Sequence, residues 1–510
     1  MPGEKPIRPK PHLSKSRYLA GLQCERRLWL GWYDPERMAD PPPGTILAVG
    51  HEVGEYAHRL FPGGVLVGGG PREFYEAVAR TSTLLADSET SAIFEAAFEF
   101  DDVWVRVDVL ERAQTGGWVL NEVKSSTRVK PENIDDLAIQ RYVVEGCGLE
   151  VVATNLIHVD TSYVRGVDGI DWRGFFRICD VTGEVLGALA AAPGRVAQMH
   201  RVLALIAAPE RRPSSHCFAP FSCEFWDRCT ANKPVDWIWH LPHLRAKQLT
   251  ALEAMGIESI RSVPADFPLS GAQRRVVEAF RTGDFVIQPA LSAALVRQAG
   301  RSAFLDFETF SPAVPLYAGT SPYQRIAAQW SMHFGQEDGT VEHKEFIADL
   351  AKDPRRAFAE SLLEAAEGDG PIFVYSSFER SVLDELAKHL PELAEGLRDL
   401  GKRLSDLLPI VRDCVDHPAF KGSNSIKAVA PVLDPELSYD DLPGIAHGDA
   451  ASAALYRLAT GRFQIDETPD ALKAALLQYC ALDTLALVRT RRALTVLAER
   501  GPPMSAPMIR

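Results

Sequence analysis

The sequence predicts an α/β protein with two α/β domains joined by a small helical linker. Three observations lead to this prediction. The chain has 510 residues, about three times the usual length of one domain, so more than one core is expected. Apolar residues make up 46% of the chain and charged residues 24%, as in folded globular proteins. Apolar strand-like runs alternate with helical patterns, which is typical of α/β domains.

The first domain is predicted over residues 13–235. Residues 1–12 are rich in Pro and Lys and are expected to form a disordered tail. A helical pattern begins at Ser14 and runs through SKSRYLAGLQCERRLWLGW until the tract DPPPGT breaks it. Further helices are predicted in VGHEVGEYAHRLF and PREFYEAVARTSTLLAD, on either side of a short strand in GGVLVGGG.

A strand meander follows these helices. The runs AIFEAAFEF, VWVRVDVLER and GWVLNEVKSS are expected to be strands, and the glycine pair between the last two suits a hairpin. The helix IDDLAIQRYVVEGCG and the apolar strand VVATNLIHV come next. Residues 195–235 are expected to be helical and to end in a cluster of cysteines. This order of elements predicts an α/β sandwich.

The second domain is predicted over residues 299–498, after a helical linker at 236–298. The linker, around MGIES, resembles a helix–hairpin–helix, which binds the DNA backbone through helix N-termini; a plain helical connector is the alternative. The domain begins with the strands AFLDFETF and AQWSMHFG, a long helix and the strand PIFVYSSF. Helices rich in Leu and Ala follow, and residues 499–510 are expected to be a flexible tail.

The charge of the chain argues against a protein that coats nucleic acid by bulk electrostatic attraction. The net charge is −13, although residues 1–30 carry seven Lys and Arg against two Glu. No window approaches the roughly 18 consecutive apolar residues of a membrane span, and the apolar stretch of a secretory signal is absent. Eight cysteines are too few for a disulfide scaffold. The predicted location is the cytoplasm.

Asp108, Glu122 and Lys124 form the first candidate active site. The period of two in a strand puts Glu122 and Lys124 on one face, and an adjacent strand can bring Asp108 beside them. Two carboxylates suit a hard Mg²⁺ or Mn²⁺ ion, and a lysine can orient or deprotonate the attacking water. A surface hairpin with alternating charges is the plain alternative. The apolar run around Asp108 and the helix residue Gln140 favour the active site.

These residues resemble the RecB-like branch of the PD-(D/E)XK nucleases through Asp108, Glu122-Val123-Lys124 and Gln140. The resemblance implies a restriction-endonuclease-like fold in which Asp108 and Glu122 bind metal, Lys124 serves the nucleophilic water and Gln140 orients the site. The family often has a Tyr four residues after the Gln, whereas Tyr142 comes two after it. A metal-binding His usually lies upstream in a G-x-x-x-H helix. The candidates for this fourth ligand are His51, Glu52, Glu55 and His58.

Cys24, Cys217, Cys223 and Cys229 form a second constellation. The last three are spaced C-x5-C-x5-C among aromatic and apolar residues, which is not a zinc-finger spacing. They suit a buried cluster that lacks one ligand, and Cys24, in an Arg-flanked helix ahead of the strands, is the natural fourth. The arrangement resembles the iron–sulfur nucleases of the AddB and CRISPR-adaptation type, which implies a 4Fe–4S cluster that closes the nuclease domain. Structural Zn²⁺ is the alternative.

Asp306, Glu308, Glu379, Tyr479 and Asp483 form the third constellation. Asp306 and Glu308 share one face of an apolar strand, where two like charges are costly unless a cation lies between them. Tyr479 and Asp483 are four residues apart on one helical face, and Glu379 lies where a strand leads into a helix. An edge strand with solvated acids is the plain alternative.

This set resembles the DnaQ-like (DEDDy) exonucleases of the RNase H fold. Asp306 and Glu308 match the first motif, and Tyr479 and Asp483 match the third. The resemblance implies two Mg²⁺ or Mn²⁺ ions held by Asp306, Glu308 and Asp483, with the Tyr positioning the water. The second motif normally supplies an Asp, where this chain has Glu379.

The two halves together resemble a bacterial family of predicted nucleases that combines an iron–sulfur RecB-like domain with a DnaQ-like domain. The function expected from this resemblance is metal-dependent hydrolysis of DNA, in single strands or at ends, for DNA repair or phage defence. The RecB-like part would cut single-stranded DNA and the DnaQ-like part would trim 3′ to 5′. One alternative is a nucleic-acid-binding scaffold of a protein complex with a degenerate site. Another is an RNase that acts through the DnaQ-like half.

Overall fold

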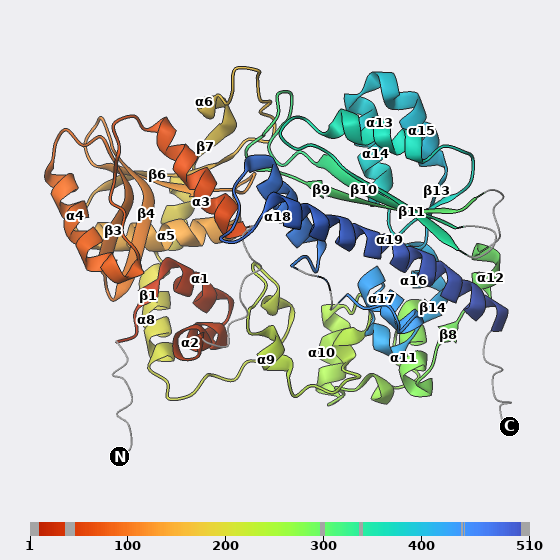
Figure 1. Ribbon diagram of the computed structural model, residues 1–510. Coiled ribbons are helices and arrows are strands. Elements are labelled where there is room, and N and C mark those ends of the chain that lie inside the picture. Colours follow the sequence, from red (N-terminus) through yellow and green to blue (C-terminus); the bar gives the residue numbers. More distant parts are fainter. Residues whose placement is uncertain are drawn as a thin grey trace, which may run out of the picture. The chain divides into compact units, whose positions relative to one another are not determined.

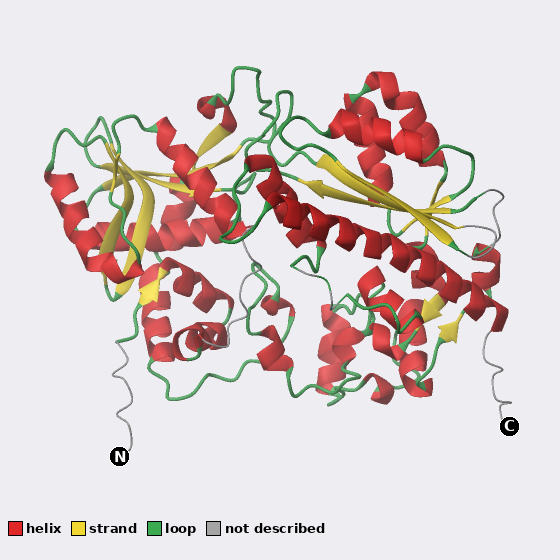
Figure 2. Ribbon diagram, viewed as in Figure 1, coloured by secondary structure: helices red, strands yellow, loops and turns green. Residues whose placement is uncertain are grey.

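Two large mixed β-sheets organise the chain, one in each of two compact units (Figures 1 and 2). The computed structural model describes residues 10–35, 46–295, 301–335, 340–439, 442 and 444–500. The first unit comprises Met1–Asn232 with Pro312–Gln324, and the second comprises Lys233–Ser311 with Arg325–Arg510. The prediction of an α/β protein is confirmed. The predicted tails, 1–12 and 499–510, lie outside the described residues except for 10–12 and 499–500.

The first unit is built on a seven-stranded sheet. Its order is β2-β3-β4-β5-β6-β7, and β1 pairs in parallel with β4. β3, β4 and β5 form an antiparallel meander, and β6 lies parallel to β5. The strands are β1 (Leu13–Ser14), β2 (Val65–Leu66), β3 (Ala92–Phe100), β4 (Val103–Arg112), β5 (Trp118–Lys124), β6 (Val151–Val159) and β7 (Phe176–Asp180).

Two hydrophobic clusters hold helices against this sheet. One joins Leu137 and Val143 of α5 with Val105 and Leu156 of the strands. The other joins Val53 of α3 with strand residues such as Phe94 and Ile157. The helices of the unit are α1 (Lys15–Gln23), α2 (Glu25–Tyr33), α3 (Ile46–Ala57), α4 (Phe74–Ala86), α5 (Pro131–Gly146), α6 (Trp172–Phe175), α7 (Thr182–Leu189), α8 (Ala192–Leu203) and α9 (Trp226–Thr230).

Two helical predictions for the first unit need correction. The helix predicted from Ser14 is split into α1 and α2, because Cys24 has an extended backbone with φ −162° and ψ 120°. Residues 195–235 are helical only in α8 and α9 and in the short 3-10 turn Ser215–Cys217, and the chain between them is irregular. Both departures lie at cysteines of the predicted cluster.

The segment Pro312–Gln324, which in sequence follows the strand Ala303–Phe310 of the second unit, belongs to the first unit. Ala313 and Val314 are buried in the hydrophobic cluster that contains Val53. The Tyr323 hydroxyl donates a hydrogen bond to the backbone carbonyl of Ser125, directly after β5. This excursion therefore packs beside the strand that carries Glu122 and Lys124.

The second unit is built on a five-stranded sheet of order β11-β10-β9-β12-β13. β9, β10 and β11 are antiparallel neighbours, whereas β12 lies parallel to both β9 and β13. A separate two-stranded sheet joins β8 and β14. The strands are β8 (Val286–Ile287), β9 (Ala303–Phe310), β10 (Ile326–Gly335), β11 (Val341–Ile347), β12 (Ile372–Val374), β13 (Leu404–Asp406) and β14 (Val415–Asp416).

Helices of the second unit pack in two groups against this sheet. Phe358, Val382 and Leu397 bring α13, α14 and α15 into one cluster with β9 and β10. Leu487 and Val488 bring α19 into another cluster with β9 and β12. The helices are α10 (Ala246–Ala254), α11 (Gly271–Thr282), α12 (Ala290–Ala294), α13 (Arg355–Ala365), α14 (Phe378–His389), α15 (Ala394–Lys402), α16 (Leu408–Cys414), α17 (Ile426–Leu433), α18 (Gly448–Thr460) and α19 (Pro469–Arg500). Residues of the predicted linker, 236–298, form α10 to α12 within this unit.

The long helix α19 is the one described helix whose length and composition would allow it to cross a membrane. Half of its most apolar window is buried inside the protein. Polar side chains are among the buried residues, including Asp483, Thr484 and Thr490. These features are typical of a core helix, so the prediction of a cytoplasmic protein is not contradicted.

Candidate active sites

The first candidate site lies in the first unit, where β4 and β5 run side by side. Val109 pairs with Asn121 in this ladder, so Asp108 and Glu122 occupy the next positions on the two strands. The backbone N–H of Val123 donates a hydrogen bond of 2.8 Å to Asp108 Oδ2. This bond fixes the Asp108 carboxylate beside Glu122.

Glu122 is the centre of the hydrogen-bond network in this site, and its side chain is 1% exposed. Lys124 Nζ donates to Glu122 Oε1 at 2.6 Å and to Asp136 Oδ2 at 2.7 Å. Gln140 Nε2 donates to Glu122 Oε2 at 2.8 Å and to Asp136 Oδ1 at 3.2 Å. The structure therefore brings together the four residues predicted for this site. The oxygen Oε1 of Gln140 is buried without a hydrogen-bond partner.

Two residues that the sequence analysis missed complete the network. Asp136 precedes Gln140 by one helical turn on α5, and this i, i+4 spacing was the available signal. Lys15, the first residue of α1, places its Nζ 2.9 Å from Glu122 Oε1 and 3.4 Å from Asp108 Oδ1. Lys15 lies 93 positions before Asp108, and no local pattern links the two.

Burial and crowding change the proton affinities of this site. Burial and the charge of Glu122 raise the pKa of Asp108 to about 7. Burial also disfavours the charged form of Glu122. The positive charges of Lys124 and Lys15 outweigh the effect of burial and hold the pKa of Glu122 below the usual range. Burial lowers the pKa of Lys124, but the negative charges of Glu122 and Asp136 raise it by more, so the pKa of Lys124 is raised overall. At neutral pH the metal-free site thus holds an ionised Glu122, an ammonium on Lys124 and a partly protonated Asp108.

Glu95 is a further acid near this site that the sequence analysis missed. It interrupts the β3–β4 ladder between the pairs Phe94–Val109 and Ala96–Val107, which places it across from Asp108. Its φ of 58° is unusual for a residue with a side chain and is often found at functional sites. Burial raises its pKa, and Lys15 is the first charge that opposes the rise. An acid flanked by apolar residues within the strand AIFEAAFEF was the signal.

The four candidates for the upstream ligand fall into different places. The G-x-x-x-H spacing is met by Gly54 and His58, but the His58 ring stacks on Phe94 at 3.9 Å. Burial lowers the pKa of His58, and the charge that acts on it comes from Glu55. His51 acts on Glu95 electrostatically. His51 is therefore linked to the site by an electrostatic interaction.

The four predicted cysteines of the first unit line one cavity of about 20 Å³. Cys24 lies at the end of α1, and Cys229 lies in α9. Cys223 donates its backbone N–H to the carbonyl of Cys217 at 2.8 Å, which closes the loop between them. The neighbouring Gln23 fastens this loop to α1, because its Nε2 donates to two backbone carbonyls of the loop, each at 2.7 Å.

The spacing of these thiols bears on what they could bind. A tetrahedral Zn²⁺ with Zn–S bonds of about 2.3 Å requires sulfurs roughly 3.8 Å apart. Among the described residues, no three of the four cysteine sulfurs come within 4.8 Å of one another. Burial raises the pKa of Cys217 and raises that of Cys223 to about 11, so binding of a metal would release protons. Four thiols around one cavity are a donor set that fits a sulfur-ligated metal group.

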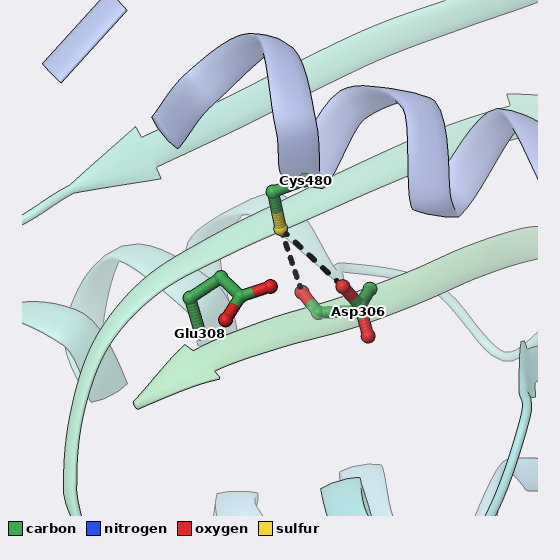
Figure 3. Close-up of side chains that lie close together, drawn as sticks. All are labelled: Asp306, Glu308 and Cys480. Carbon is green, nitrogen blue, oxygen red and sulfur yellow. Dashed lines mark hydrogen bonds between the residues drawn. The ribbon is translucent and has the colours of Figure 1, made fainter. Parts of the chain in front are cut away.

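The second candidate site lies in the second unit, between β9 and α19. Asp306 and Glu308 point from one face of β9 toward Cys480 of α19 (Figure 3). One ligand atom from each of these three residues lies within 4.8 Å of the other two. Cys480 Sγ donates to Asp306 Oδ2 at 3.6 Å and contacts the Asp306 carbonyl at 3.8 Å. Cys480 was not among the predicted site residues.

Asp483 reaches the same site one turn further along α19. Burial is the main cause that raises the pKa of Asp306 and of Glu308, and the charge of Asp483 is the next. The hydroxyl of Tyr439 donates to Asp483 Oδ1 at 2.9 Å, and Tyr479 also hydrogen-bonds Asp483. The predicted residues Asp306, Glu308, Tyr479 and Asp483 are thus gathered at one place.

Lys427 supplies a positive charge beside these acids. Its Nζ donates to the Tyr479 hydroxyl at 2.9 Å and to the Ala446 carbonyl at 2.9 Å. It lowers the pKa of Asp483 and of Glu308, but burial outweighs it and both values remain raised. Neither Lys427 nor Tyr439 was predicted, because each lies in a segment whose local pattern shows only a helix or a turn.

Glu379 stands at the start of α14 and is 3% exposed. Its Oε2 has no hydrogen-bond partner. Burial raises the pKa of Glu379 to about 8, and the charge of Asp406 at the end of β13 adds to the rise. Glu379 raises the pKa of both Asp306 and Glu308, so its charge acts on their site. Asp406 is a further acid that the sequence analysis missed.

The fold and these sites define a class: an α/β protein with one cluster of buried carboxylates in each of its units. Comparison with known families adds one assignment. Residues 303–425 match DUF2779, a domain of unknown function. The chain therefore contains a DUF2779 domain, which includes Asp306, Glu308 and Glu379 and ends before Tyr479 and Asp483.

Two other similarities are more distant. The "Uncharacterized protein MG366 homolog" of Mycoplasma pneumoniae is 27% identical over 215 residues, which are 37% of this chain and 31% of that protein. The chain thus matches about a third of the length of this curated relative. The crystal structure of SSO0001 aligns with 44% of this chain and 88% of its own, at 13% identity and a TM-score of 0.22. A similarity this weak supports no statement about fold. The nuclease families named above remain predictions.

Proposed function

We propose that this protein is a metal-dependent nuclease with two hydrolytic sites, one in each unit. The observation that carries the proposal is the set of four carboxylates in the second unit, Asp306, Glu308, Glu379 and Asp483. All four have raised pKa values, for which burial is the main cause in each. Such a set is costly without cations, and divalent ions held between carboxylates are the usual means of phosphodiester hydrolysis.

The strand order of the second unit supports a DnaQ-like, RNase H-type domain. In chain order its strands occupy the positions 3-2-1-4-5, with the first three antiparallel and the last two parallel. The RNase H fold has this arrangement. Asp306 and Glu308 lie on its first strand, Glu379 follows the fourth strand, and Asp483 lies on the last helix.

In the second site, Asp306, Glu308 and Asp483 would hold Mg²⁺ or Mn²⁺, and Glu379 is a further ligand candidate. The bound ions would supply a nucleophilic hydroxide and stabilise charge on the phosphate. Tyr479 would position the water, since its hydroxyl is held between Lys427 and Asp483. Lys427 would keep that hydroxyl aimed and would offset negative charge.

In the first unit, a PD-(D/E)XK nuclease site of RecB-like type is supported by the meander β3-β4-β5 and by α5 beside it. Asp108 and Glu122 would hold the metal ion. Lys124 would orient or deprotonate the attacking water, and its ammonium is held in place by Asp136. Gln140 would hold the side chains of Glu122 and Asp136 in fixed positions through its two hydrogen bonds.

The four cysteines would hold a 4Fe–4S cluster in preference to Zn²⁺. All four cysteines line one cavity, and no three of their sulfurs lie within 4.8 Å of one another among the described residues. The cluster would fasten α1 to the loop that precedes α9, and its role would be structural. The partners would be DNA single strands or ends, with RNA as the alternative substrate, and the cytoplasm would be the site of action.

A nuclease assay tests the proposal. Anaerobically purified protein is incubated with Mg²⁺ or Mn²⁺ and with DNA or RNA labelled at the 5′ or 3′ end, in single- and double-stranded forms. Lys124→Ala and Asp306→Ala should each remove a different set of products, and the double variant should remove all cleavage. Because each change removes part of a catalytic centre, the affected rate should fall by roughly 100-fold or more. Equal cleavage by all four proteins would contradict the proposal, and binding without cleavage would favour a scaffold.

A further inference from the structure

Lys15 stands between the two carboxylates of the first site. Its Nζ lies 2.9 Å and 3.2 Å from the two oxygens of Glu122 and 3.4 Å from Asp108 Oδ1. Lys124, the predicted lysine, bonds Glu122 and Asp136 instead. The ammonium of Lys15 therefore joins the carboxylates of two neighbouring strands, as a bridging metal ion would.

The hydrogen bonds of Glu122 leave no free direction for a metal ion while Lys15 is in place. Oε1 accepts from Lys15 and Lys124, and Oε2 accepts from Lys15 and Gln140. An ionised carboxylate offers about four lone-pair directions, and all four are used. Asp108 Oδ1 also faces Lys15. An ion that binds both carboxylates must therefore take the place of the Lys15 ammonium.

We propose that Lys15 is the resident counter-ion of the first site. In the metal-free protein its ammonium occupies the position of a divalent ion and holds two buried carboxylates together, and metal binding displaces it. This inference rests on the metal site in the proposed function. It adds a residue outside the predicted motif and gives it a defined role, which is to compete with the metal.

The structure allows the displacement without movement of α1. The backbone of Lys15 is fixed by its neighbour Ser14. Ser14 pairs with Trp104 of β4 in the sheet, and the Ser14 Oγ accepts a hydrogen bond from the backbone N–H of Arg17. The side chain of Lys15 is 25% exposed, so rotation about its methylene bonds can carry the ammonium toward solvent. The other end of α1 is held by Gln23, whose Nε2 donates to the carbonyls of His216 and Phe221, each at 2.7 Å.

Mn²⁺ binding to the full-length chain tests this inference. Asp306→Asn and Asp483→Asn are introduced together to silence the second site, and the dissociation constant is measured by electron paramagnetic resonance or calorimetry. In this background Lys15→Met should tighten Mn²⁺ binding by about tenfold or more, because a like charge a few ångströms away shifts ion binding by roughly one to three decades. The metal-free Lys15→Met protein should also melt at a lower temperature than the metal-free parent. Mn²⁺ should raise the melting temperature of the variant by more than it raises that of the parent.

Lys130→Met is the matched control, since Lys130 lies in the same unit with a side chain 45% exposed and contacts Glu132 at 4.0 Å. It should leave the dissociation constant unchanged. Equal or weaker Mn²⁺ binding by Lys15→Met would overturn the role of Lys15 and leave the metal site standing. Absence of Mn²⁺ binding in every protein would overturn the metal site and, with it, this inference. Cleavage is measured separately, so failure of the nuclease proposal alone would show as binding without products.

Discussion

Glu379 shows at the scale of one residue what a buried carboxylate costs the metal-free protein. Its ordinary pKa of 4.5 is raised to about 8 by burial and then by Asp406. A raised pKa means that the folded state prefers the protonated acid. The stability from this group is therefore fully present below about pH 4.5 and is lost as the pH rises through about 8.

Replacement of Glu379 by Gln should remove this pH dependence. Each unit of pKa difference corresponds to about 1.4 kcal/mol, so Glu379→Gln should stabilise the metal-free protein by several kcal/mol at pH 8.5 and by little at pH 4.5. The measurement is urea unfolding with a chelator present across this pH range. Glu395→Gln, a change of an exposed acid on the neighbouring helix α15, should have no such effect. A curve for Glu379→Gln that runs parallel to the parent curve would contradict the assignment.

Single residues also mark what could be predicted from the sequence. Glu122 and Lys124 follow from the period of a strand. Asp108 and Gln140 were predicted from their apolar and helical surroundings and from the resemblance to RecB-like nucleases, and the structure brings all four together. Lys15 could not be inferred in this way, because its contact with Glu122 spans 107 positions and depends on how α1 packs. Contacts of this kind depend on tertiary structure, which local periodicity does not encode.

At the scale of elements, the helix α19 contributes three buried residues to the second site. Tyr479, Cys480 and Asp483 are buried residues of this helix, and Thr484 forms 2.8 Å hydrogen bonds with Ser331 and His333 of β10. The hydroxyls of Tyr479 and Tyr439 both reach Asp483. The proposed function gives the role of positioning the attacking water to Tyr479 and not to Tyr439. The two tyrosines should therefore differ in their effect on cleavage.

Tyr479→Phe should slow cleavage by the second site by roughly 100-fold, since a positioned proton-transfer group contributes about that much. Mn²⁺ affinity should change little, because the carboxylates remain. Tyr439→Phe removes the other hydroxyl on Asp483 and should cost less than about tenfold. Both rates are measured in a Lys124→Ala background, so that only the second site acts. Equal losses in the two variants would show that Tyr479 only supports Asp483.

Helix and strand types were predicted better than helix breaks. The strands β3, β4 and β6 begin and end where the apolar runs do, because their apolar residues are buried in the core of the sheet. The break between α1 and α2 at Cys24 was missed, because SRYLAGLQCERRLWL reads as one helical pattern. The extended backbone of Cys24 is a local conformation that helix propensity does not report.

At the scale of the whole molecule, the α/β class and the presence of two sheets were predicted, whereas the excursion of one later segment into the first unit was not. Segment Pro312–Gln324 belongs to the first unit although the strand before it belongs to the second. An excursion of this kind leaves no trace in composition. It means that the first unit is not a single continuous stretch of sequence, so an isolated fragment 13–235 would lack residues that pack against Val53.

A substitution in the cysteine cluster should affect the cleavage activity proposed for the first unit and leave that of the second unit. Cys223→Ser should remove iron and sulfide from the purified protein, lower its visible absorption and reduce Lys124-dependent cleavage by about tenfold or more, because α1, which packs against β4 and α5 beside the first site, loses its attachment at Cys24. Cleavage that depends on Asp306 should change little, since the cluster lies wholly in the first unit. Cys147→Ser, a change of an exposed cysteine outside the cluster, is the control and should retain full metal content. Zinc in place of iron in anaerobically purified parent protein would establish the structural zinc alternative, and equal loss of both activities would show that the cluster supports the entire chain.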